Sequence, residues 1–310
     1  MSFMASAVHT VVRTVLACGL LAGAAAVQVD AQRPHGVPPG LLKKGTSSSP
    51  GTALPDAGSA APVSTPAVRT FGVWLDDATV LGAGETWLTV SAQRWASPDL
   101  HGFDVPALDL ATGLTSRLQA SASVPFTQHA VSGAPMNGNL GDVYAGVKYV
   151  VRDPSGGRLG VSVAPTVEVL SRAATVDTGL SRVNAVLPVS LEWRRGEIRG
   201  YASTGWYTRG AVFVAGAIER PLAERLRASG GLTYSRSTAP GEASTAWGFA
   251  HHRVDASGSA SYVISPRLVA FAGIARTLSQ LDPDGTRYAV SFGTSMDLGR
   301  RTPSRPPVRP

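Results

Sequence analysis

Charged side chains at alternate positions of long apolar stretches are the residues of this sequence best suited to chemistry. A charged group that faces an enclosed, low-dielectric interior acts on a solute more strongly than it would in water. Their spacing predicts inward-facing residues, and eight of them are candidates for lining the interior and selecting solutes: Asp142, Lys148, Glu168, Glu192, Arg225, Arg227, Arg253 and Asp255. Arg152, Arg194, Arg287 and Asp297 are also expected to face inward. Two interpretations stay open, a network in which these charges satisfy one another and a constriction that selects solutes by charge.

Three of these residues, Arg225, Arg227 and Arg253, form the densest basic group in the predicted interior. The planar guanidinium group of arginine offers several donors and suits the recognition of carboxylates or phenolates. We therefore expect this group to be the first candidate for contact with a negatively charged solute.

The sequence lacks the residue patterns of an enzyme active site. Nucleophilic catalysis needs a serine positioned by a histidine, and no His-x-Ser pairing accompanies His251 and His252, which adjoin an expected strand entrance. Neighbouring strand residues point to opposite faces, so this histidine pair is a poor metal site. Glycine-rich phosphate loops and basic-aromatic interleaving are also absent from the sequence. We expect no catalytic residue, no metal, no cofactor and no nucleic-acid partner.

The elements that must position these side chains are long strands, because the hydrophobic period from residue 84 onward is two. In the stretch from Val254 to Ile264, apolar or small residues alternate with Asp255, Ser257, Ser259 and Ser261. The pattern predicts about twelve strands, an even number as in outer-membrane barrels. Their expected ranges are 85–96, 105–113, 117–127, 140–152, 158–170, 182–194, 197–208, 211–220, 225–236, 252–264, 267–278 and 287–298.

Strand length and connection length favour an all-β transmembrane barrel, antiparallel and up-and-down, over a soluble sandwich. Strands of about 10 residues suffice to cross a membrane when tilted, whereas globular strands usually have 5 or 6. Short turns alternate with long loops, as in outer-membrane barrels, except at Arg209-Gly210, where the connection is short and a long one is due. Aromatic residues are expected to form two girdles at the membrane interfaces, with Phe126, Tyr234 and Tyr288 at the external end and Tyr149, Trp193 and Tyr262 at the periplasmic end.

The ends of the chain have a different composition from the strand region. Residues 1–31 are expected to be a signal peptide, with an apolar run after Arg13 and cleavage after Ala31. Residues 32–69 predict a disordered linker rich in Pro, Ser, Gly and Ala, and residues 300–310 a disordered Pro/Arg tail. The barrel is assigned to 70–299, and whether 70–83 forms an extra strand stays open. Of the 310 residues only 16% are charged, and much of the net charge of +7 lies in these ends.

Several short motifs resemble an outer-membrane barrel family described as the putative MetA-pathway of phenol degradation. The motifs are Gly141-Asp142 with Gly146 and Lys148-Tyr149, the hairpin from Gly113 to Phe126, and Tyr262-Val263-Ile264-Ser265-Pro266-Arg267-Leu268. The resemblance covers residues 84 to 298. It implies an outer-membrane transporter or channel, with aromatic or other hydrophobic compounds as solutes in some members, and it supplies no catalytic residues.

Two function classes follow from the sequence. The first is a passive outer-membrane channel for small or elongated solutes, because a barrel of about twelve strands is narrower than porins of roughly 16 or more. The family resemblance implies hydrophobic or aromatic compounds among these solutes. The second is a non-conducting structural barrel that anchors a periplasmic tether, and a membrane-embedded hydrolase is a remote third. The expected partners are outer-membrane lipid, the barrel assembly machinery and a small permeant. Both termini are expected in the periplasm.

Overall fold

The computed structural model describes the strand region of the chain. The described residues are 75–98, 100–131, 136–154, 157–171, 181–208, 210–238, 252–279 and 286–299. The predicted signal peptide, linker and tail, and His251, lie outside them. Within these ranges, no helix has the length and apolar character needed to cross a membrane.

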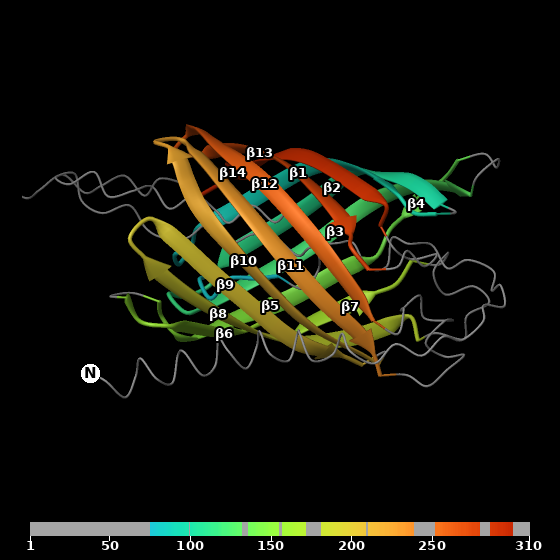
Figure 1. Cartoon of the computed structure of the whole chain (residues 1–310). Helices are drawn as coiled ribbons and strands as arrows, with labels where there is room; N and C mark the ends of the chain where they lie inside the picture. Colours follow the sequence, from blue (N-terminus) through green and yellow to red (C-terminus); the bar gives the residue numbers. More distant parts are fainter. Residues whose placement is uncertain are drawn as a thin grey trace, which may run out of the picture. The chain divides into compact units, whose positions relative to one another are not determined.

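The described residues form one antiparallel sheet of fourteen strand segments (Figure 1). The segments are β1 (Thr86–Ala96), β2 (Leu100–Gly113), β3 (Leu118–Val131), β4 (Asn137–Leu140), β5 (Val143–Arg152), β6 (Gly160–Val163), β7 (Thr166–Val169), β8 (Val183–Arg195), β9 (Ile198–Tyr207), β10 (Ala211–Ala223), β11 (Leu226–Ser237), β12 (Arg253–Ser265), β13 (Leu268–Thr277) and β14 (Tyr288–Asp297).

The fourteen segments make up twelve strands of a closed barrel. The segments β4 and β5 both pair with β3 and are halves of one strand, and β6 and β7 both lie between β5 and β8. The first and last strands close the sheet, because β1 pairs with β14 from Trp87↔Asp297 to Ala96↔Tyr288. The predicted number of strands and the up-and-down order are confirmed.

The burial pattern is the reverse of that of a soluble protein. Large apolar side chains cover the outer face, where Ile218 is 56% exposed and Phe292 is 63% exposed. The inner face buries polar side chains, among them Glu168 and Glu192. A soluble sandwich would hide the first set and expose the second. The inversion is that of a transmembrane barrel, whose outer side chains meet lipid.

The outward aromatic residues lie near the two ends of the strands. Tyr149, Trp193 and Tyr262 lie at the ends that carry the short turns, and Phe126, Tyr234 and Tyr288 lie near the opposite ends. Five of them are about 40–50% exposed and Tyr234 is half-buried. Trp193 lies over its partner Gly200 on β9, where a Cβ atom would stand 1.9 Å from the indole ring. Their role as membrane girdles remains a prediction.

Two strands continue further than their apolar pattern predicted. Segments 97–104 and 128–139 were expected to be loops, yet β2 begins at Leu100 and β3 continues to Val131. The two ends pair with each other, as in His101↔Ala130. Polar residues such as His101 and His129 interrupt the apolar alternation there, so hydrophobic period alone could not reveal strand beyond it.

Candidate functional site

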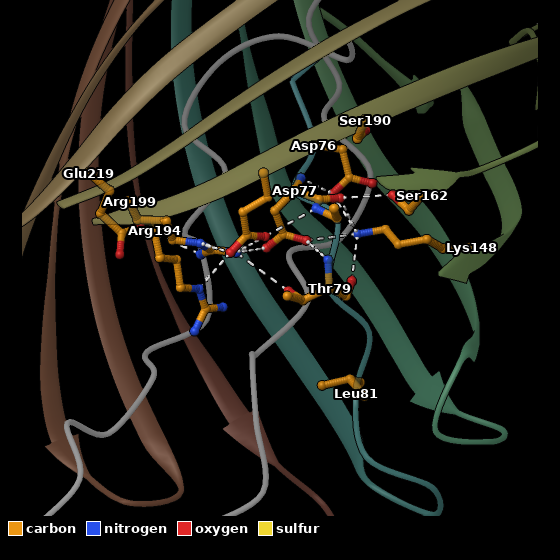
Figure 2. Close-up of polar contacts among 12 residues, drawn as sticks. Asp76, Asp77, Thr79, Leu81, Lys148, Ser162, Ser190, Arg194, Arg199 and Glu219 are labelled. Carbon is orange, nitrogen blue, oxygen red and sulfur yellow. Dashed lines mark hydrogen bonds and ion pairs between the residues drawn. The ribbon is translucent and has the colours of Figure 1, made fainter. Parts of the chain in front are cut away.

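The segment before β1, residues 75–85, lies inside the barrel, and we call it the luminal segment (Figure 2). Its side chains Asp77, Ala78 and Leu81 are at most 1% exposed. Leu75 packs against a cluster that includes Tyr207 and Phe213, at the ends of β9 and β10 where these two strands connect, opposite the turn between β8 and β9. Leu81 packs in a cluster near the short turns. The luminal segment therefore runs lengthwise along the interior, and it contains no strand.

Side chains of the barrel wall hold the backbone of the luminal segment. The amide N–H of Asp76 donates to Ser203 Oγ at 2.8 Å, that of Ala78 to Glu192 Oε2 at 3.2 Å, and that of Leu81 to Gln119 Oε1 at 3.0 Å. Ser203 and Glu192 come from neighbouring strands, β9 and β8, and Gln119 comes from β3. These bonds give the buried backbone amides the hydrogen-bond partners that water would provide at the surface.

The luminal segment joins β1 through a tight turn. Gly84 has φ of 78°, a conformation that other residues adopt with strain, and Glu85 N–H donates to Gly82 O. Beside the turn, Gly84 and Glu85 exchange backbone hydrogen bonds of 2.8 and 2.9 Å with Gly113. A Cβ atom at Gly113 would stand 2.1 Å from Gly82 O, so only glycine allows this approach.

Among the described residues, eight side chains form an ion-pair network that fixes the middle of the luminal segment. Of these, Figure 2 labels Asp76, Asp77, Lys148, Arg194, Arg199 and Glu219. Lys148 Nζ lies 2.7 Å from Asp76 Oδ1 and 3.0 Å from Asp77 Oδ1, and Arg199 Nη2 pairs with Asp77 Oδ2. The other wall members are Glu192, Glu219, Arg194 and Arg227. Arg199 joins the two halves, since its Nε lies 2.8 Å from Glu192 Oε1 and its Nη1 3.9 Å from Glu219 Oε2.

The network keeps Asp77 ionised although the residue is buried. Burial by itself would raise the pKa of the Asp77 carboxyl. The positive charges of Lys148 and Arg199, together with their hydrogen bonds, outweigh burial and hold this pKa well below its usual range. The luminal segment is therefore bound to the wall as an anion at every ordinary pH.

Apolar and aromatic side chains flank the charged network on both sides. On one side, Leu75 adjoins Tyr144, Tyr207 and Phe213, with the Tyr207 and Phe213 rings 6.4 Å apart in an edge-to-face arrangement. On the other side, Leu81 packs with Trp87 and other apolar residues. The interior thus holds apolar side chains at both ends of the charged network.

The structure places three of the eight candidates in this network, together with Arg194, which was also expected to face inward. Lys148 and Glu192 contact the luminal segment directly. Arg227 joins through Glu219, with Nη1 2.9 Å from Oε1. A fourth residue, Glu168, is fully buried and accepts a 2.8 Å hydrogen bond from the Tyr144 hydroxyl. Whether any of these residues selects solutes remains a prediction.

The expected group of three arginines is not formed. On the paired strands β11 and β12, Arg227 lies opposite Ser261, whereas Arg253 lies opposite Ser235 near the other end of the barrel. Eight residues of strand, about 26 Å at 3.3 Å each, separate the two positions. Neighbouring antiparallel strands bring two residues together only when both lie at the same distance from the connection between the strands. Arg227 and Arg253 lie at different distances from it.

The remaining predicted residues have separate positions. Arg225 is exposed in the turn before β11. Arg253 Nε pairs with Asp255 Oδ2 at 3.1 Å, and Asp255 also accepts a 2.6 Å hydrogen bond from Thr277. Asp142, buried between β4 and β5, accepts a 2.8 Å hydrogen bond from the backbone of Ser171. These contacts stabilise strand ends and a loop.

Sequence reasoning missed Asp76, Asp77, Arg199 and Glu219. The sequence did contain a sign of the first two, because Asp76 and Asp77 are adjacent carboxylates in the otherwise apolar stretch 71–83. Arg199 and Glu219 are inward on the alternation of β9 and β10, as their burial shows. Among the described residues no group of His, Cys, Asp and Glu is suited to hold a metal ion.

Comparison with known proteins supports the barrel fold alone. No protein-family model matches the sequence, and no curated protein matches it. Among solved structures, the COG4313 outer membrane channel from Pseudomonas putida F1 is similar with a TM-score of 0.55 and 13% identity, over 71% of this chain and 98% of that chain. The NanC porin has a TM-score of 0.49 and 10% identity, and KdgM porin in complex with disordered oligogalacturonate 0.48 and 9%, each over 67% of this chain and 98% of the other. The first of these likenesses shows the shared barrel fold.

Proposed function

We propose that this protein is a passive outer-membrane channel for small solutes, and that the luminal segment obstructs its path. The observation that carries the proposal is a closed barrel with an apolar exterior whose interior is occupied by a segment held through wall side chains. A segment that only filled space could have packed by apolar contacts alone. Here it lies in a polar, charged interior, which is the kind of interior that passes solutes.

The class of solute follows from the narrow interior and its chemistry. Barrels of about eight strands are filled by side chains and those of 16 or more hold wide water channels, so twelve strands suit small or elongated solutes. The aromatic cluster around Tyr207 and Phe213 supports hydrophobic or aromatic compounds among them. The family resemblance in the sequence points to the same solutes and remains a proposal, as do the outer-membrane location and the periplasmic placement of both termini.

Conductance in planar bilayers tests the proposal. We expect small current steps from the full chain and larger steps after deletion of residues 75–81, which removes the segment and keeps the turn at Gly84. Deletion of residues 47–53, of equal length in the predicted linker, is the matched control and should leave the steps unchanged. Heat-modifiable gel mobility and outer-membrane fractionation confirm that each variant is folded and located as proposed.

The occupied interior also favours the alternative, a structural barrel that conducts nothing. The network pairs both aspartates of the luminal segment, Asp76 and Asp77, with bases of the wall, as a permanent seal would require. If neither the full chain nor the variant without residues 75–81 conducts ions, the channel is refuted and the structural barrel is supported.

A further inference from the structure

The wall around the luminal segment carries more positive than negative charge. In the ion-pair network the wall supplies four bases, Lys148, Arg194, Arg199 and Arg227, and two acids, Glu192 and Glu219. The luminal segment supplies the two missing negative charges through Asp76 and Asp77. Without the segment, Lys148 and Arg199 would lose the carboxylates of Asp76 and Asp77, which is costly in a low-dielectric interior unless another anion replaces them.

The luminal segment is held in the manner of a bound ligand. From Asp76 to Leu81, the hydrogen bonds of its backbone amides go to wall side chains and to its own carboxylates. Pairing of its backbone with a strand begins only at Gly84. A segment bound through side chains can be replaced by a solute that offers the same groups, and the two then compete by mass action.

The carboxylates of the segment have an apolar neighbour at a defined place. Leu75, next to Asp76, packs on the cluster of Tyr144, Tyr207 and Phe213. Leu75 and Asp76 are consecutive residues, so an apolar group about one residue away from a carboxylate on Lys148 would reach this cluster. The ring next to the Arg199 guanidinium is that of Tyr201, with its centroid 5.4 Å from Cζ. Arg199 offers the flat set of donors that fits a carboxylate, and Lys148 adds a second charge.

We propose that this part of the wall, Lys148 and Arg199 with the aromatic cluster of Tyr144, Tyr207 and Phe213, is a binding site for small carboxylates that bear an apolar group. Asp76 and Asp77, with Leu75, occupy it in the closed state. A solute of this class displaces the luminal segment and thereby opens the path through the barrel interior along which the solute passes. The site rests on the proposed channel function and names its substrate class.

The test measures exposure of the luminal segment. The chain's single cysteine, Cys18, lies in the predicted signal peptide, so Ala78→Cys places one thiol at a fully buried position of the segment. Its rate of reaction with a maleimide in the folded, detergent-purified protein reports how often the segment leaves the wall. Benzoate is the probe, acetate has the charge without the ring, and benzyl alcohol has the ring without the charge.

We expect benzoate to raise the labelling rate to a plateau. Acetate should need a concentration at least about tenfold higher, because it lacks the ring that the aromatic cluster would bury. Benzyl alcohol should leave the rate unchanged. In the Asp76→Asn/Asp77→Asn background the segment should label rapidly without any solute, and in the Lys148→Gln background the response to benzoate should be lost.

Two results overturn the site. One is equal action of benzyl alcohol and benzoate, and the other is a labelling rate that no carboxylate changes in protein with normal heat-modifiable mobility. Bilayer recordings of the same variants separate this inference from the channel itself. If benzoate raises the labelling rate but no variant conducts ions, the binding site is supported and the channel is refuted. If the protein conducts ions but benzoate does not change the labelling rate, the channel is supported and the binding site is refuted.

Discussion

Replacement of Arg199 by methionine should release the luminal segment. Arg199 pairs with Asp77, Glu192 and Glu219, and its own side chain is 7% exposed. Removing one partner of a buried ion pair costs about 3–5 kcal/mol, because the other charge stays buried without compensation. Methionine keeps much of the volume and removes the charge.

The release of the luminal segment depends on the part of this free-energy cost that concerns Asp77, because Asp77 is the partner of Arg199 on the segment. Glu192 keeps Arg194 and the Ala78 amide, and Glu219 keeps Arg227. Asp77 keeps only part of its charge compensation, from Lys148, and it regains water when the segment leaves. We therefore take the lower end, about 3 kcal/mol. At 1.4 kcal/mol for each factor of ten, the population of released segment should rise about 100-fold.

Maleimide labelling of Ala78→Cys measures this population, and Arg194→Met is the matched control. Arg194 pairs with the same carboxylate, Glu192, but its side chain is 36% exposed. Exposed pairs contribute about 0–1 kcal/mol, so this variant should change the rate by about fivefold at most. The reasoning is refuted if Arg199→Met labels no faster than the parent, or if Arg194→Met has the same effect.

Three further outcomes are expected. Gly113→Val should push the turn at Gly82 away from β2, because its Cβ would stand 2.1 Å from Gly82 O, and should raise single-channel conductance; unchanged conductance would contradict the close approach. Because the pKa of Asp77 is lowered by folding, the stability that it provides is present above about 3.9, the ordinary pKa of aspartate, and is lost only as pH falls well below it. Labelling of the segment, divided at each pH by the labelling rate of a fully exposed cysteine because only the thiolate reacts, should therefore stay constant from pH 8 to pH 4. A rise of this ratio centred near pH 4 would show that Asp77 is not paired. Tyr144→Phe removes the hydrogen bond to the buried Glu168 and should lower the free energy of unfolding by about 1–3 kcal/mol. Urea titration, followed by heat-modifiable gel mobility, measures this free energy. An unchanged free energy of unfolding would mean that another group satisfies the Glu168 carboxylate.

The sequence by itself determined the barrel. Alternation such as that from Val254 to Ile264 is a local property of the strand, and each strand repeats it, so positions of strands and their inner and outer faces could be read without coordinates. An even number of strands with alternating short and long connections leaves few arrangements other than an up-and-down barrel. The alternation also predicted the inward orientation of Lys148 and Glu192. It could not predict the end of β3, where polar residues such as His129 continue the strand.

Only the tertiary structure decided what fills the barrel. Asp77 meets Lys148 and Arg199 across 71 and 122 residues of chain, and nothing local in the sequence encodes which inward charges face each other across the interior. Register likewise separated Arg227 from Arg253, although they lie on paired strands. The face of a strand follows from a period of two residues, whereas a site inside the barrel depends on how distant strands and the luminal segment are aligned, which closure of the sheet alone determines.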